Sequence, residues 1–301
     1  MFEGTGQTVR RRSAQAVAAV VAAGAVAAGS LAAAPQAAAL TIVNCATSSL
    51  QTAINNAAPG ELLLITGTCT GNFTVNKNLT LGGATTTTLT AAGSGTALTV
   101  TPGVSVSLMR LTVTGGRASN GGGIFNNGTL SLNSTVVSGN RAIFTAGGTG
   151  GGGGIYNAPG ATLTLNGARV TGNFAGVNDG GIAGFGGGIV NWGTLQSSSA
   201  TVSGNTGQFG GGILLLNSGV ATLTNTTVSG NTAPGGQGGG INNDSGVLRL
   251  TRSTISTNTA PGGGTGGGIY NANVVTQIGS TITNNTPNNC AGPAPVPGCV
   301  G

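Results

Sequence analysis

The tetrapeptide GGGI occurs six times in this 301-residue chain, and this repetition limits the possible folds more than any other feature. The copies are separated by 31, 34, 24, 28 and 28 residues and end at Ile124, Ile155, Ile189, Ile213, Ile241 and Ile269. A glycine-rich nucleotide-binding loop is expected once, between a strand and a helix, with an acidic residue about 20 positions later. None of the six copies has that context. A recurring period of this length indicates a solenoid, in which each repeat adds one coil.

Two further segments recur between successive GGGI copies. One is a column of asparagines at Asn140, Asn173, Asn205, Asn231, Asn258 and Asn285. Three residues before each asparagine stands an aliphatic residue, namely Val137, Val170, Val202, Val228, Ile255 or Ile282. The other segment alternates apolar and polar residues, at 129–133, 162–166, 221–225 and 247–251. Period-2 alternation is typical of a strand with one buried face, so each repeat is expected to contain three short strands.

Strands this short cannot bury a face alone, but stacked coils can pair them in parallel around a narrow aliphatic core. The predicted fold is therefore all-β, a three-sided parallel β-solenoid, with the glycine runs as turns that allow positive φ and close backbone approach. The V-x-x-N asparagines are expected to form an amide ladder along the stack. A second asparagine column is interrupted by Leu215 and comprises Asn126, Asn157, Asn191, Asn243 and Asn271. Solvent-facing turn positions remain an alternative for some of these asparagines.

The chain is expected to divide into a signal peptide, 1–39, and one β-helix domain, 40–301. An arginine triplet at 10–12, an alanine-rich run and a small-residue cleavage site at 37–39 are typical of an export signal, with an uncleaved anchor as the alternative. Helical spacing of apolar residues at 50–57, with Ser48 or Ser49 as the N-cap and Pro59 as the stop, predicts a short N-terminal capping helix.

The four cysteines are expected to form disulfides because an exported chain enters an oxidising compartment. Three pairings are possible. We expect Cys45 with Cys69 and Cys290 with Cys299, since each closes a short loop at one end of the chain. A zinc site is disfavoured, because the sequence contains no histidine and no close C-x-x-C pair.

The GGGI and V-x-x-N motifs resemble the GGAI and FxxN repeats of chlamydial polymorphic outer-membrane proteins. They are more similar to secreted bacterial right-handed parallel β-helix repeat proteins, over roughly 110–290. Glycine replaces alanine in the first motif, and valine or isoleucine replaces phenylalanine in the second. The resemblance implies a right-handed solenoid, export, and a place outside the cell or on its surface. We expect no integral membrane domain after signal cleavage.

Catalysis is disfavoured by the residue types that are missing. No Ser-His-Asp or Cys-His arrangement is possible without histidine. After the leader, the carboxylates are Glu61, Asp179 and Asp244, whereas glycoside hydrolysis usually needs two carboxyl groups about 5 to 9.5 Å apart. We expect no enzyme, metal or cofactor. The alternative is a polysaccharide lyase or hydrolase on the same scaffold, with Asp244 near Arg249 and Arg252.

A binding role is therefore expected. After the leader, the sequence has seven basic and three acidic side chains, a net charge of +4. The basic residues are scattered along the sequence, which disfavours a nucleic-acid site. If each GGGI isoleucine points inward, the residue after it points outward. The predicted surface binding stripe is Phe125, Tyr156, Trp192, Leu214 and Tyr270, with Val190 and Asn242 in the same series. Trp192 is included because it lies two residues after Val190 and therefore has the same parity. The alternative is that the glycine-rich turns fold over this stripe and cover it.

The expected function is a secreted or cell-surface, non-catalytic scaffold, adhesin-like or associated with the envelope. Its expected partner is a glycan, a cell-wall polymer or a surface protein, and the oligomeric state is left open. Threonine-rich strings such as ATTTTLT at 84–90 also raise ice binding. The variable coil length of 24 to 34 residues disfavours the regular hydroxyl ladders that ice binding requires.

Overall fold

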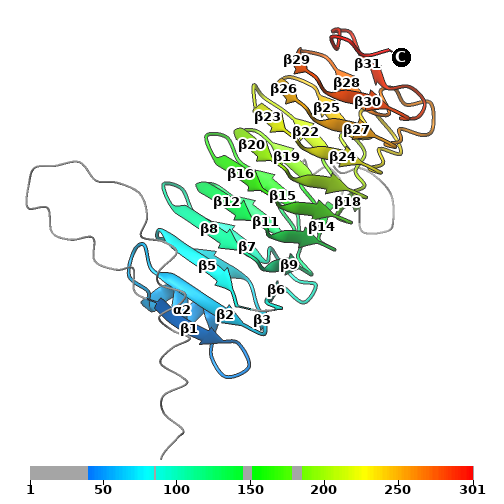
Figure 1. Ribbon diagram of the computed structural model, residues 1–301. Helices are drawn as coiled ribbons and strands as arrows, with labels where there is room; N and C mark the ends of the chain where they lie inside the picture. The colour runs from blue at the N-terminus through cyan, green and yellow to red at the C-terminus, as the bar shows by residue number, and fades with distance from the viewer. Residues whose placement is uncertain (1–39, 85, 145–150, 178–184, 301) are drawn as a thin grey trace, which may run out of the picture. The chain divides into compact units, whose positions relative to one another are not determined.

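The computed structural model describes residues 40–300 except 85, 145–150 and 178–184. Residues 38–301 form one compact unit. The expected signal peptide at 1–39 lies outside the described residues. The unit is a β-helix: short strands stack coil upon coil into three long parallel sheets, from the blue N-terminal strands to the red C-terminal ones in Figure 1.

Sheet 1 contains the longer strands, each of five residues, and begins with the first strand of the described chain. Its strands, in spatial order, are β1 (Leu40–Asn44), β2 (Leu62–Thr66), β5 (Leu79–Gly83), β8 (Ser105–Met109), β12 (Thr129–Asn133), β16 (Thr162–Asn166), β20 (Thr194–Ser198), β23 (Val220–Thr224), β26 (Val247–Thr251) and β29 (Val274–Ile278).

Sheets 2 and 3 form the other two sides of the β-helix. Sheet 2 comprises β3 (Thr68–Thr70), β6 (Thr88–Thr90), β9 (Thr112–Thr114), β13 (Val136–Ser138), β17 (Arg169–Thr171), β21 (Thr201–Ser203), β24 (Thr227–Ser229), β27 (Thr254–Ser256) and β30 (Thr281–Thr283). Sheet 3 comprises β4 (Phe73–Val75), β7 (Leu98–Val100), β11 (Ile124–Asn126), β15 (Ile155–Asn157), β19 (Ile189–Asn191), β22 (Ile213–Leu215), β25 (Ile241–Asn243), β28 (Ile269–Asn271) and β31 (Cys290–Ala291).

The predicted strand segments and their parity are confirmed. The segments at 129–133, 162–166 and 247–251 are strands of sheet 1, and the one expected at 221–225 is β23, one residue earlier. The GGGI isoleucines are fully buried and pair in register along sheet 3. Val137, Val202, Val228 and Ile255 are also fully buried, in one register column of sheet 2. These columns form the aliphatic core.

A small fourth sheet was not expected. It has one strand in each of three successive coils, and each strand follows the sheet 2 strand of its coil. The strands are β10 (Arg117–Ala118), β14 (Arg141–Phe144) and β18 (Phe174–Val177). The guanidinium of Arg141 lies 4.3 Å from the ring centroid of Phe174 in the next coil, a cation–π contact. Each of these strands lies in the connection between a strand of sheet 2 and the following strand of sheet 3.

Most of the variation in coil length lies at one corner, since from β11 to β29 the connection from sheet 3 to sheet 1 varies only between two and four residues. From β8 to β30, two residues separate each strand of sheet 1 from the following strand of sheet 2. From β9 to β28, by contrast, the connection from sheet 2 to sheet 3 varies between nine and seventeen residues. Our inference that variable coils disfavour regular side-chain ladders is therefore wrong, because the extra residues leave the register of the sheets unchanged.

Both asparagine columns are buried amide ladders. In the V-x-x-N column, each side-chain nitrogen donates to the amide oxygen one coil further on, at 2.9 to 3.0 Å from Asn140 through Asn173, Asn205, Asn231 and Asn258 to Asn285. The same nitrogens donate to a backbone carbonyl of the previous coil, for example from Asn205 to Val170. The second ladder stops at Leu215, as its sequence indicates.

The three glycines of GGGI have two different roles. The first adopts positive φ, as at Gly210 with φ of 62°. The next two lie against the neighbouring coil: a Cβ at Gly212 would stand 2.6 Å from the carbonyl oxygen of Gly240 and 3.0 Å from the Asn231 amide nitrogen. Backbone crowding, rather than flexibility, therefore explains the triplet.

The ends of the stack are closed as expected. Helix α2 (Leu50–Asn56) begins after Ser49, whose side chain accepts a hydrogen bond from the Thr52 amide, and it buries Leu50 and Ile54. Disulfides join Cys45 to Cys69 and Cys290 to Cys299. The edge strands of a solenoid need such covers, because their backbone groups have no next coil to pair with.

Candidate functional site

Apart from Trp192, the predicted binding stripe lies in one register column of sheet 3, but it is not continuously exposed. Phe125 and Tyr156 are half-buried and stack with centroids 5.2 Å apart and an interplanar angle of 12°. Burial of Tyr156 raises the pKa of its phenol. In the next coils Val190 and Leu214 are each 1% exposed. The column opens again at Tyr270, which is half-buried.

The glycine-rich turns cover the middle of the stripe. A Cβ at Gly186 would stand 2.4 Å from Cγ2 of Val190, and one at Gly210 would stand 2.9 Å from Cβ of Leu214. The rings of Phe185 and Phe209, which belong to these turns, stack at 5.7 Å between centroids. The alternative reading, in which turns cover the stripe, is thus correct for its centre.

Trp192 lies at the next outward position after Val190, just beyond β19. It is half-buried, and its indole nitrogen is buried without a hydrogen-bond partner among the described residues. The aromatic part of the stripe is therefore the stacked pair of Phe125 and Tyr156, with Trp192 and Tyr270 as further rings, rather than one continuous surface.

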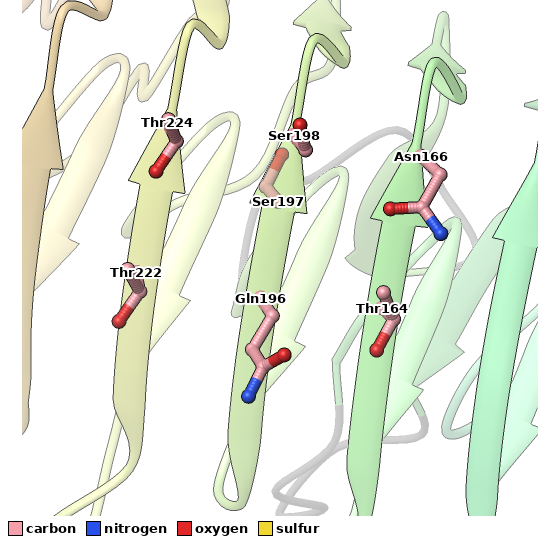
Figure 2. A pocket seen from close by; sticks show the side chains of 7 residues that line it. All are labelled: Thr164, Asn166, Gln196, Ser197, Ser198, Thr222 and Thr224. Carbon is pink, nitrogen blue, oxygen red and sulfur yellow. The ribbon is translucent and has the colours of Figure 1, made fainter. Parts of the chain in front are cut away.

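The outer face of sheet 1 carries a polar column from β8 to β29 that sequence reasoning did not single out, although apolar side chains such as Met109, Val274 and Ile278 are exposed at the ends of its strands. Its central register column is Ser107, Ser131, Thr164, Gln196, Thr222, Arg249 and Thr276. A hollow of about 320 Å³ lies on this face, across β16, β20 and β23. Figure 2 shows its lining: Thr164, Asn166, Gln196, Ser197, Ser198, Thr222 and Thr224. The period-2 alternation could have identified these outward residues.

Most of the lining is free to bind. The side chains of Thr164, Gln196 and Thr222 make no hydrogen bond with another described residue, whereas Asn166 donates to Asn133 at 2.9 Å. Ser197 is different: it faces inward at the position where the neighbouring strands carry Leu165 and Leu223. Its hydroxyl lies 2.8 Å from that of the buried Thr226. This serine is therefore held within the corner of the β-helix and is not a free nucleophile.

The acidic residues are dispersed. Glu61 lies near the N-terminal end, where hydrogen bonds from Thr41 and from the Ala58 amide, with the charge of Lys77, hold its pKa below the usual range despite burial. Asp244 follows β25 of sheet 3. Asp179 lies outside the described residues.

The structure does not bring together the residues of the alternative lyase site. Arg249 points outward from sheet 1, whereas Asp244 lies on the outer side of sheet 3. Arg252 stands at the corner between sheets 1 and 2, where it donates to Asn225 at 3.1 Å. In the described part of the chain, no group of three potential metal ligands gathers. No helix among these residues is long and apolar enough to cross a membrane.

Comparison with known proteins identifies the fold. No protein-family model matches the sequence, and no curated protein matches it. The structure is similar to one described as "Crystal structure of pectate lyase Pel9A", with a TM-score of 0.56 and 16% sequence identity over 85% of this chain and 76% of that one. This similarity identifies the chain as a parallel β-helix scaffold.

Proposed function

We propose that this protein is a non-catalytic β-helix of the cell exterior that binds a polysaccharide along the outer face of sheet 1. The observation that carries the proposal is the row of hydroxyl and amide side chains on that face, including the unpaired Thr164, Gln196 and Thr222. Parallel strands repeat such groups at about 4.8 Å, so a chain of hydroxyl-rich sugars can meet equivalent donors and acceptors coil after coil. The two disulfides are consistent with an oxidising compartment.

Binding without turnover is favoured by the chemistry of this face. General acid–base catalysis needs a group of suitable pKa at the reacting bond. The hollow is lined by hydroxyl and amide groups alone, and the charged side chain nearest to it in the central column is Arg249. The structural neighbour is described as a pectate lyase, but its fold alone is shared at this identity.

The test is a binding screen of residues 40–301 against pectate, alginate, hyaluronan and chitin, by calorimetry, with product release followed with and without calcium. Replacing Gln196 and Thr222 together by alanine should weaken binding about tenfold, because two neutral hydrogen bonds are lost. The matched control, Ser229→Ala on sheet 2, should leave affinity unchanged. Turnover that Asp244→Ala abolishes would establish the enzyme alternative instead. Binding to a surface protein but to no glycan would also overturn the proposal.

The outer face of sheet 2 supports a second candidate function, binding to ice. Both outward positions are threonine or serine in seven of its nine strands: β3, β6, β9, β21, β24, β27 and β30. In the four neighbouring strands β21, β24, β27 and β30, these hydroxyls form a grid of about 4.8 Å between strands and about 6.6 Å along them, whereas Val136 and Arg169 interrupt it at β13 and β17. Those of Thr227, Ser229 and Thr254 make no hydrogen bond with another described residue. A flat grid of unpaired hydroxyls can match an ordered water lattice.

Thermal hysteresis and ice recrystallisation assays test this second function. Thr227→Lys should abolish any activity, because a charged, long side chain disrupts the grid, whereas Thr222→Lys on sheet 1 should not. No hysteresis from the wild-type protein would exclude it.

A further inference from the structure

A second hollow, of about 250 Å³, lies over the covered part of sheet 3. It is lined by Phe185, Phe209, Leu214, Leu216, Gln237, Asn242 and Asp244. Leu214 and Asn242 are register partners on adjacent strands, β22 and β25. Phe185, Phe209 and Gln237 belong to the glycine-rich turns above them. The hollow is therefore lined by residues at two strands of sheet 3 and by residues of three successive glycine-rich turns.

Asn242 is the unusual residue in this hollow. Between β11 and β28, the other members of its column are apolar or aromatic: Phe125, Tyr156, Val190, Leu214 and Tyr270. Asn242 is 2% exposed, and its side-chain nitrogen donates to the Gln237 carbonyl at 3.3 Å. The side-chain oxygen is buried without a hydrogen-bond partner among the described residues. A buried acceptor without a partner is destabilising unless a donor reaches it, so the hollow calls for a ligand with a hydrogen-bond donor.

The other residues that line the hollow indicate the charge of the group that contains this donor. Asp244 is two residues further along, in the bend after β25; it lines the same hollow, and its side chain is exposed. The stacked rings of Phe185 and Phe209 and the side chains of Leu214 and Leu216 supply apolar walls. Carboxylate, amide oxygen and aromatic rings all favour a cation, through charge, hydrogen bonding and cation–π attraction.

We propose that this hollow binds a protonated amino sugar. Its ammonium would be held between Asn242 Oδ1 and the Asp244 carboxylate, with one face of the sugar ring against the Phe209 side of the hollow. The volume is below the range of about 300–1,000 Å³ that is usual for drug-sized ligands, which fits a single ring. The site lies on a different sheet from the polysaccharide face proposed above, and the inference stands independently of that function.

The test compares glucosamine, N-acetylglucosamine and glucose as ligands of residues 40–301, by saturation-transfer NMR and calorimetry. Glucosamine should bind about tenfold more tightly than either neutral sugar, because a hydrogen bond to a charged group is lost with them. Its affinity should fall as salt is added and as pH rises through the pKa of the ligand amine. Equal affinity for the three sugars, or no binding of glucosamine, would overturn the proposal.

Two variants separate the site from general effects on folding. Asp244→Asn keeps the shape of an exposed side chain and should weaken glucosamine binding about tenfold. Asn242→Leu should also weaken binding, and it should raise the melting temperature, because it removes the unpaired acceptor and restores the apolar column. A lower melting temperature would show that Asn242 has a structural role instead. Gln196→Ala, on sheet 1, should leave glucosamine binding unchanged, so failure at this site is distinguishable from failure at the polysaccharide face.

Discussion

The side-chain nitrogen of Asn231 lies 2.9 Å from the amide oxygen of Asn258, one coil further along the β-helix, and donates a hydrogen bond to it. The oxygen of Asn231 in turn accepts from both the backbone and the side-chain nitrogen of Asn205. Each asparagine thus satisfies buried polar groups of two neighbouring coils. The ladder fixes the register of the stack in a way that aliphatic contacts alone would not.

Leu215, which interrupts the second ladder, is a site where that role can be measured. Leu215→Asn should cost less than about 1 kcal/mol, because the new amide can bridge Asn191 and Asn243, its register partners. Leu215→Ala should cost about 2–5 kcal/mol, since it leaves a cavity at a fully buried position. Denaturant unfolding of the two variants gives the comparison. Equal losses would show that the ladder cannot extend through this coil.

Val228 tests the assignment of the core column. It is fully buried, so Val228→Asp would place a carboxylate in an apolar interior and should destabilise the protein by about 3–5 kcal/mol. Ser229, the next residue, faces outward and is half-buried, and Ser229→Asp should cost less than about 1 kcal/mol. Thermal melts followed by circular dichroism suffice. A Val228→Asp protein that melts like the wild type would refute the inward assignment.

Gly212 tests the explanation of the GGGI triplet. Gly212→Ala would bring a Cβ within 2.6 Å of the Gly240 carbonyl oxygen in the next coil and should cost about 1–3 kcal/mol. At Gly235 the nearest atom to a new Cβ is 3.4 Å away, on the Gln208 side chain. Gly235→Ala should be neutral or stabilise by up to about 1 kcal/mol, because it restricts the unfolded chain. Similar melting temperatures for both variants would contradict the crowding argument.

Glu61 makes the N-terminal end of the β-helix sensitive to acid. Its carboxylate accepts hydrogen bonds from Thr41 and from the Ala58 amide, which lower its pKa from the ordinary value of 4.5. A depressed folded-state pKa contributes stability that is present above pH 4.5 and is lost as pH falls through the lowered value.

Glu61→Gln should therefore melt below the wild type at pH 7, and the difference should shrink as pH falls below 4.5. Thr41→Val removes the leading cause of the shift and should narrow the same pH dependence. A difference between wild type and Glu61→Gln that is constant across this range would exclude the assigned role.

The sequence alone determined the architecture, because each repeat specifies the strands and the inward side chains of one coil. Alternation within each segment sets which side chains face inward, as for Val228 and Ile241, and the recurrence of the same motifs in successive repeats brings these side chains into columns. Local signals also sufficed at the ends, where Ser49 caps α2 and nearby cysteines pair.

The tertiary structure decided which outward residues reach solvent. Leu214 and Asn242 point away from the core, yet the glycine-rich turns that precede their strands cover them, and apolar–polar alternation does not encode this cover. It also placed Asp244 and Arg249 on different faces although five positions separate them, because the chain turns a corner between them. Parity along a strand is a local property of the backbone, whereas exposure also depends on how the turns lie over the sheet.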